Sequence, residues 1–215
     1  MPVHLIPRSL CLCLGLAILS LGVVFSIRSN LGTSPVSSLP YVYSFIVPLS
    51  VGTVTVIFHA FMIALQYLVL KDKFHWSRCL QILVGAILGL MIDALLFISQ
   101  SWQPDHYFTQ LFFCFLSCIL TAIGIIFILK ANLIYLAIEG FYEAVSNRYH
   151  IAFSRCKTIG DICMVSIALI SGLIFTQQAI GVREGTIITA LVVGSMIHWI
   201  VPYFRFIDRW VKAPH

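Results

Sequence analysis

The sequence predicts an all-α membrane protein of six transmembrane helices, arranged as two inverted three-helix repeats, each with an extra short half-helix after its first span. Three observations favour this fold class. The 215 residues are 60% apolar and 10% charged, with a mean hydropathy of +1.00, whereas about a quarter of a soluble domain is charged. Six apolar windows are long enough to cross a bilayer. The two halves of the chain also share sequence segments in the same order.

The apolar windows give the predicted elements in chain order. The six candidate spans cover residues 9–27, 51–70, 79–99, 108–130, 156–178 and 185–204. Two further apolar stretches, 35–48 and 133–147, are too short or too interrupted to cross and are typical of half-helices or interfacial helices. The first window lacks the small-residue cleavage site of a signal peptide and is long enough to span, so we expect it to be the first helix.

Lysine and arginine are unequally distributed between the two sides of this predicted domain. Of the 13 basic residues, only Arg28 and Arg183 fall on one side, and the rest fall on the side that holds both termini. Because basic residues accumulate in short cytoplasmic loops, both termini are expected to be cytoplasmic. The net charge of +5 therefore indicates orientation rather than an acidic partner, and no nucleic-acid partner is expected.

Three pairs of segments repeat along the chain. LGVVFSIRSNL at 21–31 matches IGIIFILKANL at 123–133, SVGTV at 50–54 matches TIGDI at 158–162, and GLMID at 89–93 matches GSMIH at 194–198. The repeats, 1–100 and 108–215, would form a single membrane domain. Because each contains three spans, an odd number, the second must be inverted relative to the first. Inverted repeats are common among secondary transporters.

The motifs NLGTSP at 30–35, SVGT at 50–53, GLMID at 89–93 and REGTIITALVVG at 183–194 resemble those of the YczE/YyaS/YitT group of bacterial membrane proteins. The resemblance covers most of the chain. It implies a polytopic helical fold in the bacterial cytoplasmic membrane and supplies no catalytic residues. The sequence departs from the group at His198, where an acid or an uncharged residue is more usual.

The segment after the first span contains the first group of candidate site residues: Arg28, Asn30, Thr33 and Ser34. Ser34 can cap a helix that begins at Pro35. A half-helix that begins inside the membrane directs backbone N–H groups and a positive dipole end at the midplane, which suits an anionic or carbonyl-bearing ligand. An interfacial loop with a good cap is an equally acceptable interpretation. Lys130 and Asn132 are the repeat partners of Arg28 and Asn30.

Ionisable residues inside the spans are the second group of candidates. Asp93 in the third span and its repeat partner His198 could form a proton relay, or each could simply hydrogen-bond a neighbouring helix. Asp161 could instead pair with the nearby cations Arg155 and Lys157. Glu139 and Glu143 share a helix face and could line a vestibule, although the wet face of an interfacial helix is the simpler interpretation. His59 is interpreted as a packing residue.

Function is predicted from this architecture. A small secondary transporter or permease for an unknown small solute, with its site at the repeat interface, is favoured, and a homodimer is among the assemblies considered. The alternatives are a substrate-binding subunit similar to the S components of energy-coupling-factor transporters and a structural or regulatory membrane protein. No enzyme motif is present. No cofactor or metal is expected, because Cys114 and Cys118 lack histidine or carboxylate neighbours at ligand spacing.

Overall fold

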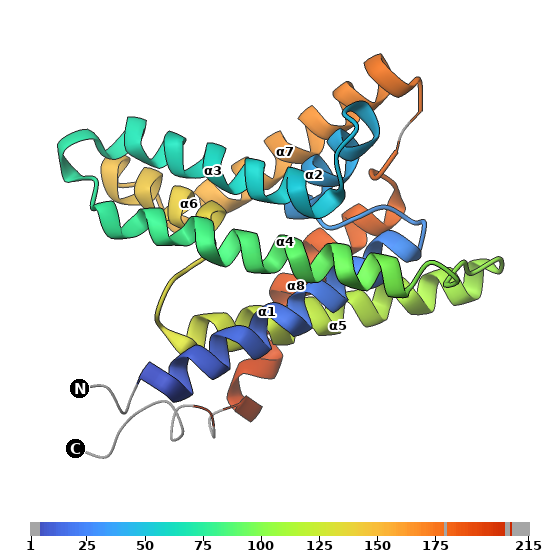
Figure 1. The fold of residues 1–215 in the computed structure, drawn as a ribbon, viewed down its shortest axis with the longest axis horizontal. Helices are drawn as coiled ribbons and strands as arrows, with labels where there is room; N and C mark the ends of the chain where they lie inside the picture. Colours follow the sequence, from blue (N-terminus) through green and yellow to red (C-terminus); the bar gives the residue numbers. More distant parts are fainter. Residues whose placement is uncertain (1–4, 179, 205–206, 208–215) are drawn as a thin grey trace.

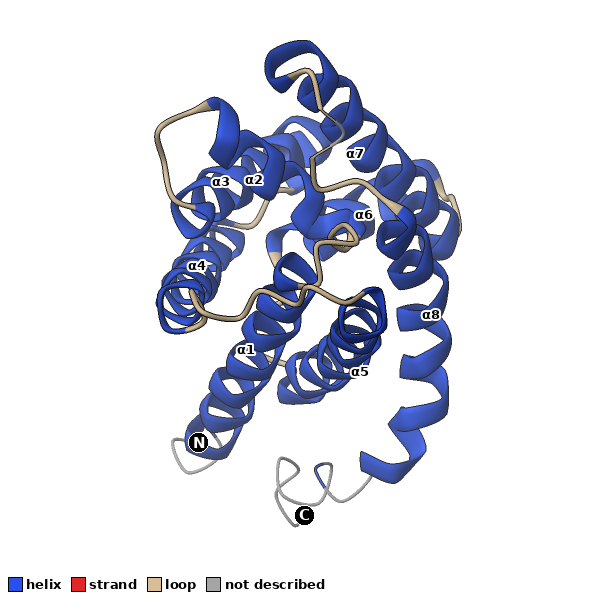
Figure 2. Cartoon of the chain, turned by 90° about the vertical axis from the view of Figure 1, so that its right-hand side faces the viewer, coloured by secondary structure: helices blue, strands red, loops and turns tan. Residues whose placement is uncertain are grey.

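The computed structural model describes residues 5–178, 180–204 and 207, and within this part the chain is all-helical (Figures 1 and 2). Short 3₁₀ turns extend α3, precede α4 and follow α8. The helices are α1 (Leu5–Arg28), α2 (Pro35–Ile46), α3 (Val51–Leu70), α4 (Gln81–Ile98), α5 (Tyr107–Ala131), α6 (Ala137–Tyr149), α7 (Phe153–Thr176) and α8 (Glu184–Ile200).

Six of these helices, with their flanking turns, are long and apolar enough to cross a membrane. They coincide with the six predicted windows. The short helices α2 and α6 have 12 and 13 residues and coincide with the two short apolar stretches. Because a helix of this length rises only about 20 Å, neither can cross a hydrocarbon core of roughly 30 Å. The predicted number and kind of helical segments are therefore confirmed.

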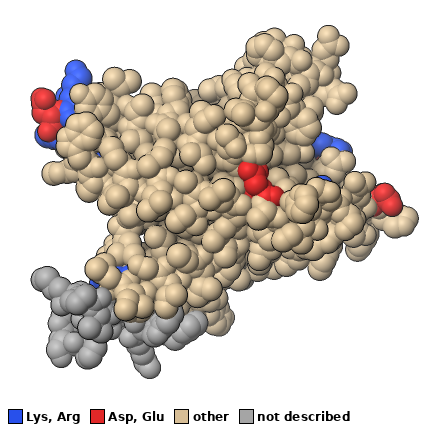
Figure 3. Space-filling view, viewed as in Figure 1, with Lys and Arg blue, Asp and Glu red and all other residues tan. Residues whose placement is uncertain are grey.

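The surface of the molecule matches that of a multi-pass membrane protein. On the face drawn in Figure 3, charged side chains gather at the two ends of the molecule, and the band between them is uncharged apart from a small acidic patch. Large apolar side chains such as Leu68, Ile174 and Leu191 are exposed on this fold. Apolar surface of this extent is suited to lipid rather than water.

The helices form two layers (Figures 1 and 2). One layer contains α2, α3, α6 and α7, in which α2 packs against α3 and α7, and α6 packs against the same two helices. The other contains α1, α5 and α8, and α4 joins the layers by packing against both α1 and α3. Helix α1 begins and α8 ends at the same end of the molecule.

Helices α1 and α5 pack side by side along their length because glycines remove the side chains between them. An added Cβ at Gly22 would lie 2.8 Å from the backbone nitrogen of Thr121, and one at Gly124 would lie 2.7 Å from that of Leu19. Both glycines belong to the first pair of matching segments. Small residues of this kind let helix backbones approach in lipid, and the contact runs antiparallel.

Helices α3 and α4 also form a close antiparallel pair, with Gly52 lying against Gly89. The matching residues of the second half behave differently. A Cβ added at Gly194 in α8 would meet no heavy atom within 4 Å, and Gly160 in α7 accommodates the ring of Tyr142. Helices α7 and α8 consequently diverge where α3 and α4 pack together (Figure 1). The matching sequences do not indicate this difference.

Candidate functional site

A cavity of about 140 Å³ lies between the two layers, and every one of the eight helices contributes to its wall. We call it the central cavity. Most of its lining is apolar, including Val23, Phe58, Leu88 and Ile125. Polar and ionisable side chains interrupt this lining. They are Ser34, Ser37, Thr55, His59, Thr121, Glu139, Lys157, Asp161 and Thr189.

The two short helices both begin at the central cavity. Residues Ser34–Ser37 at the start of α2 and Leu136 at the start of α6 line it. Ser34 and Leu136 hold the N-cap positions in nearly identical extended conformations, with φ/ψ of −62/153° and −61/150°. The Ser34 hydroxyl pairs with that of Ser37, 2.6 Å away, and not with a backbone N–H as an N-cap side chain often does. Two positive helix ends therefore lie at this cavity.

Asparagine residues set the chain direction before each short helix. Asn30 follows α1 with φ 56°, and Asn132 follows α5 with φ 46°. Asparagine tolerates this left-handed conformation better than most residues. The two asparagines that the matching segments pair thus have the same structural role. Neither lines the central cavity; Asn132 instead accepts a hydrogen bond of 3.3 Å from Tyr135.

Glu139 in the first turn of α6 is the most unusual group in the cavity wall. Its Oε2 is buried and has no hydrogen-bond partner among the described residues. Burial raises the pKa of this carboxyl, as does Asp161, while the Lys157 ammonium and the backbone N–H of Glu139 itself oppose the rise. Glu139 is half-buried as a residue, and its Oε2 is buried beside the central cavity.

His59 in α3 is a second buried polar group of the wall, only 2% exposed. Its Nδ1 has no hydrogen-bond partner in the described part of the chain. The imidazole fits because Gly85 of α4 leaves space, since a Cβ there would lie 2.5 Å from Nδ1. The sequence analysis interpreted His59 as a packing residue and did not include it among the candidate site residues. The available signal was its spacing of four from Thr55, which places both on one helix face.

A polar chain connects the cavity with the exposed surface of α7. Lys157 Nζ lies 3.1 Å from Asp161 Oδ2, and the Lys157 side chain is 41% exposed. The Tyr142 hydroxyl donates a hydrogen bond of 3.0 Å to Asp161 Oδ1, and the Lys157 ammonium lies 5.8 Å from the centre of the Tyr142 ring. Asp161 therefore pairs with one of the cations suggested for it, and it lines the central cavity at the same time.

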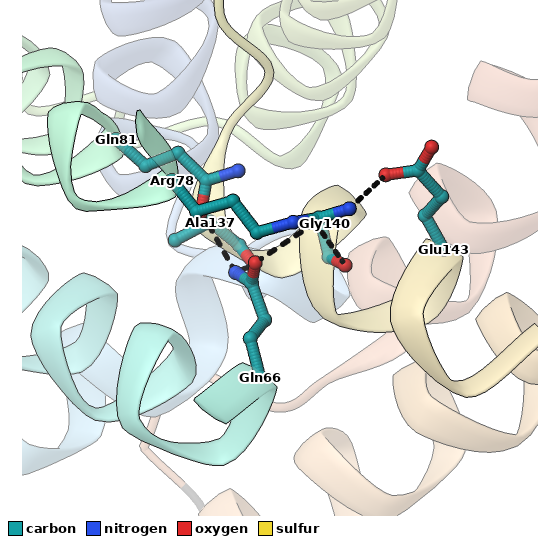
Figure 4. Close-up of polar contacts among 6 residues, drawn as sticks. All are labelled: Gln66, Arg78, Gln81, Ala137, Gly140 and Glu143. Carbon is teal, nitrogen blue, oxygen red and sulfur yellow. Dashed lines mark hydrogen bonds and ion pairs between the residues drawn. The ribbon is translucent and has the colours of Figure 1, made fainter. Parts of the chain in front are cut away.

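A second polar network fixes α6 to the α3–α4 hairpin (Figure 4). The fully buried Gln66 amide donates hydrogen bonds of 2.8 Å to Gln81 Oε1 and to the Ala137 carbonyl. Arg78 donates to Gln66 Oε1 at 3.1 Å and forms an ion pair with Glu143 at 3.2 Å. Because these bonds hold the first two turns of α6, they fix the position from which Glu139 faces the cavity.

Asp93 has different surroundings from the ionisable residues of the cavity wall. Its Oδ1 accepts a hydrogen bond of 2.7 Å from the backbone N–H of Gly52, and its Oδ2 accepts one of 2.6 Å from the Ser50 hydroxyl. These groups belong to the start of α3, where a carboxylate complements the positive helix end. His198 is exposed on α8. The two residues lie on helices that the packing keeps apart, and neither lines the central cavity.

The remaining candidates lie towards the ends of the molecule. Arg28 donates hydrogen bonds to the Leu96 carbonyl at 2.7 Å and to the Ser99 hydroxyl at 3.2 Å. Thr33 is buried, and its backbone N–H donates to the Gly181 carbonyl at 2.9 Å. Lys130 occupies the last turn of α5.

A pocket of about 520 Å³, which we call the polar pocket, lies at the end of the molecule away from the start of α1, and its wall includes Asn30, Thr33 and Arg183. Arg183 also donates to the Asn30 carbonyl at 3.0 Å. Beside this pocket, Thr33 donates a backbone hydrogen bond to Gly181, and Gly185 donates one to Leu31. Of the residues predicted from sequence, the structure brings Ser34, Glu139 and Asp161 together.

Comparison with known proteins assigns the chain to a family. It belongs to a family of unknown function, DUF6198, whose family model matches residues 6–202. No curated protein and no solved structure matches it. In the described part of the chain, no group of three or more His, Cys, Asp or Glu side chains is placed to hold a metal ion.

Proposed function

We propose that this protein is a small secondary transporter or permease of the bacterial cytoplasmic membrane, with the central cavity as its solute site. The observation that carries the proposal is an internal cavity bounded by all eight helices, in which Glu139 and His59 keep unpartnered buried polar atoms. Ionisable groups inside membrane domains are costly and usually functional. The proposal concerns transport and not catalysis.

Inverted repeats form part of this proposal. If α1–α4 correspond to α5–α8, each observed contact α1–α4, α2–α3 and α2–α7 has a counterpart in α5–α8, α6–α7 and α6–α3. The antiparallel α1–α5 pair would then lie on the pseudo-two-fold axis. The matching conformations of Asn30 and Asn132 support the same relation. In transporters with inverted repeats, the site lies at the repeat interface.

The expected membrane orientation and the family resemblance complete the proposal. The distribution of basic residues supports cytoplasmic termini, so the polar pocket beside Arg183 would face outward. The resemblance to the YczE/YyaS/YitT group agrees with a bacterial inner-membrane location. Large apolar side chains of α8 such as Leu191 and Trp199 are exposed, and a homodimer could cover them.

The volume of the cavity limits the size of the solute that can bind there. A cavity of about 140 Å³ is close to the roughly 150 Å³ that accommodates a benzene-sized molecule. The mixture of apolar walls, hydroxyl groups and ionisable groups suits a small solute with both polar and apolar parts. The proposed substrate is therefore a small amphipathic metabolite rather than a peptide, a lipid or a sugar polymer.

The alternative of a substrate-binding subunit depends on small residues of the first helix being available to a partner protein. Gly15 and Gly22 are instead occupied by α5, because a Cβ at either position would meet α5 atoms within 3 Å. This packing favours the permease over a subunit that docks through α1. Copurification with a membrane coupling protein would reverse that preference.

The test is solute flux in proteoliposomes loaded with pooled small metabolites. Gly194→Leu is the blocking variant, because Gly194 lines the cavity and has open space around it. Ser195→Leu is the matched control, because Ser195 is its exposed neighbour and does not line the cavity. We expect flux of at least one solute that Gly194→Leu abolishes and Ser195→Leu preserves. Flux that both variants preserve, or no flux for any solute, would contradict the proposal.

A further inference from the structure

We propose that the central cavity binds a proton at Glu139 and exchanges it with the surface at Lys157 through Asp161, so that the proton is the coupling ion of the proposed permease. The inference rests on the proposed function for the meaning of coupling. Proton binding itself can be tested without any solute. The argument uses the position of Glu139, the groups that face it and the route that leads away from it.

A carboxylate in a dry interior must gain a cation, gain hydrogen bonds or take up a proton. Glu139 Oε2 has no hydrogen-bond partner in the described part of the chain. The cation that shares its cavity, Lys157, forms an ion pair with Asp161. The other nearby cation, Arg78, is bound to Gln66 and Glu143 one turn further along α6. Protonation would neutralise this half-buried carboxyl, whose charge the Lys157 ammonium and the Glu139 backbone N–H offset only in part.

The titratable groups that face Glu139 come from three helices. His59 of α3 and Lys157 and Asp161 of α7 line the cavity together with Glu139, and Tyr142 of α6 donates a hydrogen bond to Asp161. Tyr142 lies three residues after Glu139 and so on the same helix face. The wall segments of the other five helices contribute apolar, glycine and hydroxyl-bearing side chains. The ionisable groups are thus gathered on one side of the cavity.

This side of the cavity leads to the surface. Tyr142 binds Asp161 at 3.0 Å, Asp161 binds Lys157 at 3.1 Å, and the Lys157 side chain is 41% exposed. In the proposed step, Asp161 takes a proton from hydronium at the surface beside Lys157, which leaves a water molecule, and passes the proton to the Glu139 carboxylate in the same cavity. Glu139 then carries the O–H bond, and Asp161 returns to the ionised state that Lys157 and the Tyr142 hydroxyl stabilise.

A proton needs fewer ligands than a metal cation does. Sodium and other hard cations require several oxygen ligands around one point. The described residues place no group of three or more acidic, histidine or cysteine side chains together. A protonated carboxyl requires no such ligand set, and its O–H can donate to a solute that enters the cavity.

Infrared spectroscopy of the reconstituted protein tests the proposal directly, by following the C=O stretching band of a protonated carboxyl during a pH titration. We expect a band that persists at neutral pH, disappears in Glu139→Gln and shifts in frequency in Glu139→Asp. Glu184→Gln is the matched control, because Glu184 forms an exposed ion pair with Arg183 and does not line the central cavity, and it should leave the band unchanged. Asp161→Asn should slow the exchange of the band after a pH jump.

Two results would overturn the inference. One is a titrating band that survives in Glu139→Gln, and the other is the absence of a protonated carboxyl at neutral pH in the unmodified protein. Flux measurements separate this inference from the proposed function. Flux that Gly194→Leu blocks but whose pH dependence is the same in Glu139→Gln overturns the coupling and leaves the permease intact. A Glu139 band together with no flux of any solute supports proton binding and contradicts the permease.

Discussion

Glu139 occupies a position where a carboxylate usually has an ordinary explanation, since acids in the first turn of a helix complement its dipole. The surroundings make it exceptional here. The chain turns α6 inward, so this first turn lies at the central cavity and not in solvent. The sequence indicates an acid near a helix start, but the burial follows from tertiary packing. From the sequence, Glu139 could therefore be predicted only as one candidate site residue among several.

The pH dependence of stability tests this burial. Because the pKa of Glu139 is raised in the folded protein, the folded state binds more protons than the unfolded state above the ordinary glutamate pKa. Stability should then fall as pH rises from about 4.5 through the raised value. Glu139→Gln should remove this component, so the variant should melt at a higher temperature than the unmodified protein at alkaline pH, with the difference vanishing near pH 4. If the melting temperatures of Glu139→Gln and of the unmodified protein changed equally with pH, this prediction would be contradicted.

Asp93 is predicted to stabilise the start of α3 through its two hydrogen bonds. Asp93→Ala removes the acceptor for the Ser50 hydroxyl and the Gly52 N–H, and hydrogen bonds of this kind contribute about 1–3 kcal/mol. We expect a lower melting temperature in detergent, with Asp93→Asn intermediate because it keeps one acceptor oxygen. An unchanged melting temperature for Asp93→Ala would show that the α3 start needs no anchor.

Helix identity and order could be predicted because they depend on local apolar content. All six spans and both short helices lie where the hydropathy pattern places them. Which face each helix buries could not be predicted, because spans that are apolar on every side carry little rotational signal. The divergence of α7 and α8 depends on Gly160 holding Tyr142 and Gly194 holding nothing, and neither is visible in the matching segments.

Paired glycine substitutions test this difference between elements. Gly52→Ala would place a Cβ against the Gly89 carbonyl and 2.5 Å from Asp93 Oδ2, and overpacking of this kind costs about 1–3 kcal/mol. Gly194→Ala meets open space and gains helix propensity. We expect a lower melting temperature for Gly52→Ala and an equal or higher one for Gly194→Ala. Equal losses in both would show that α8 packs as closely as α4.

At the scale of the whole molecule, two layers of helices enclose a cavity to which both short helices point their first turns. Backbone hydrogen bonds join residues 31–33 to residues 181–185 beside the polar pocket, and the polar chain through Asp161 leads to the exposed side chain of Lys157. Composition and repeats predicted a membrane domain with a site between its halves. The location of that site required the fold, because Glu139, His59 and Asp161 are far apart in sequence.

Accessibility of the cavity from both sides of the membrane is the most direct test of the permease. Ser37 lines the cavity in the first turn of α2. Ser37→Cys, in a background without the seven native cysteines, can be treated with a small impermeant thiol reagent from either face of oriented vesicles. The account predicts labelling from both faces, and its loss when Gly194→Leu is added. Labelling from one face only, or from neither, would contradict alternating access to the central cavity.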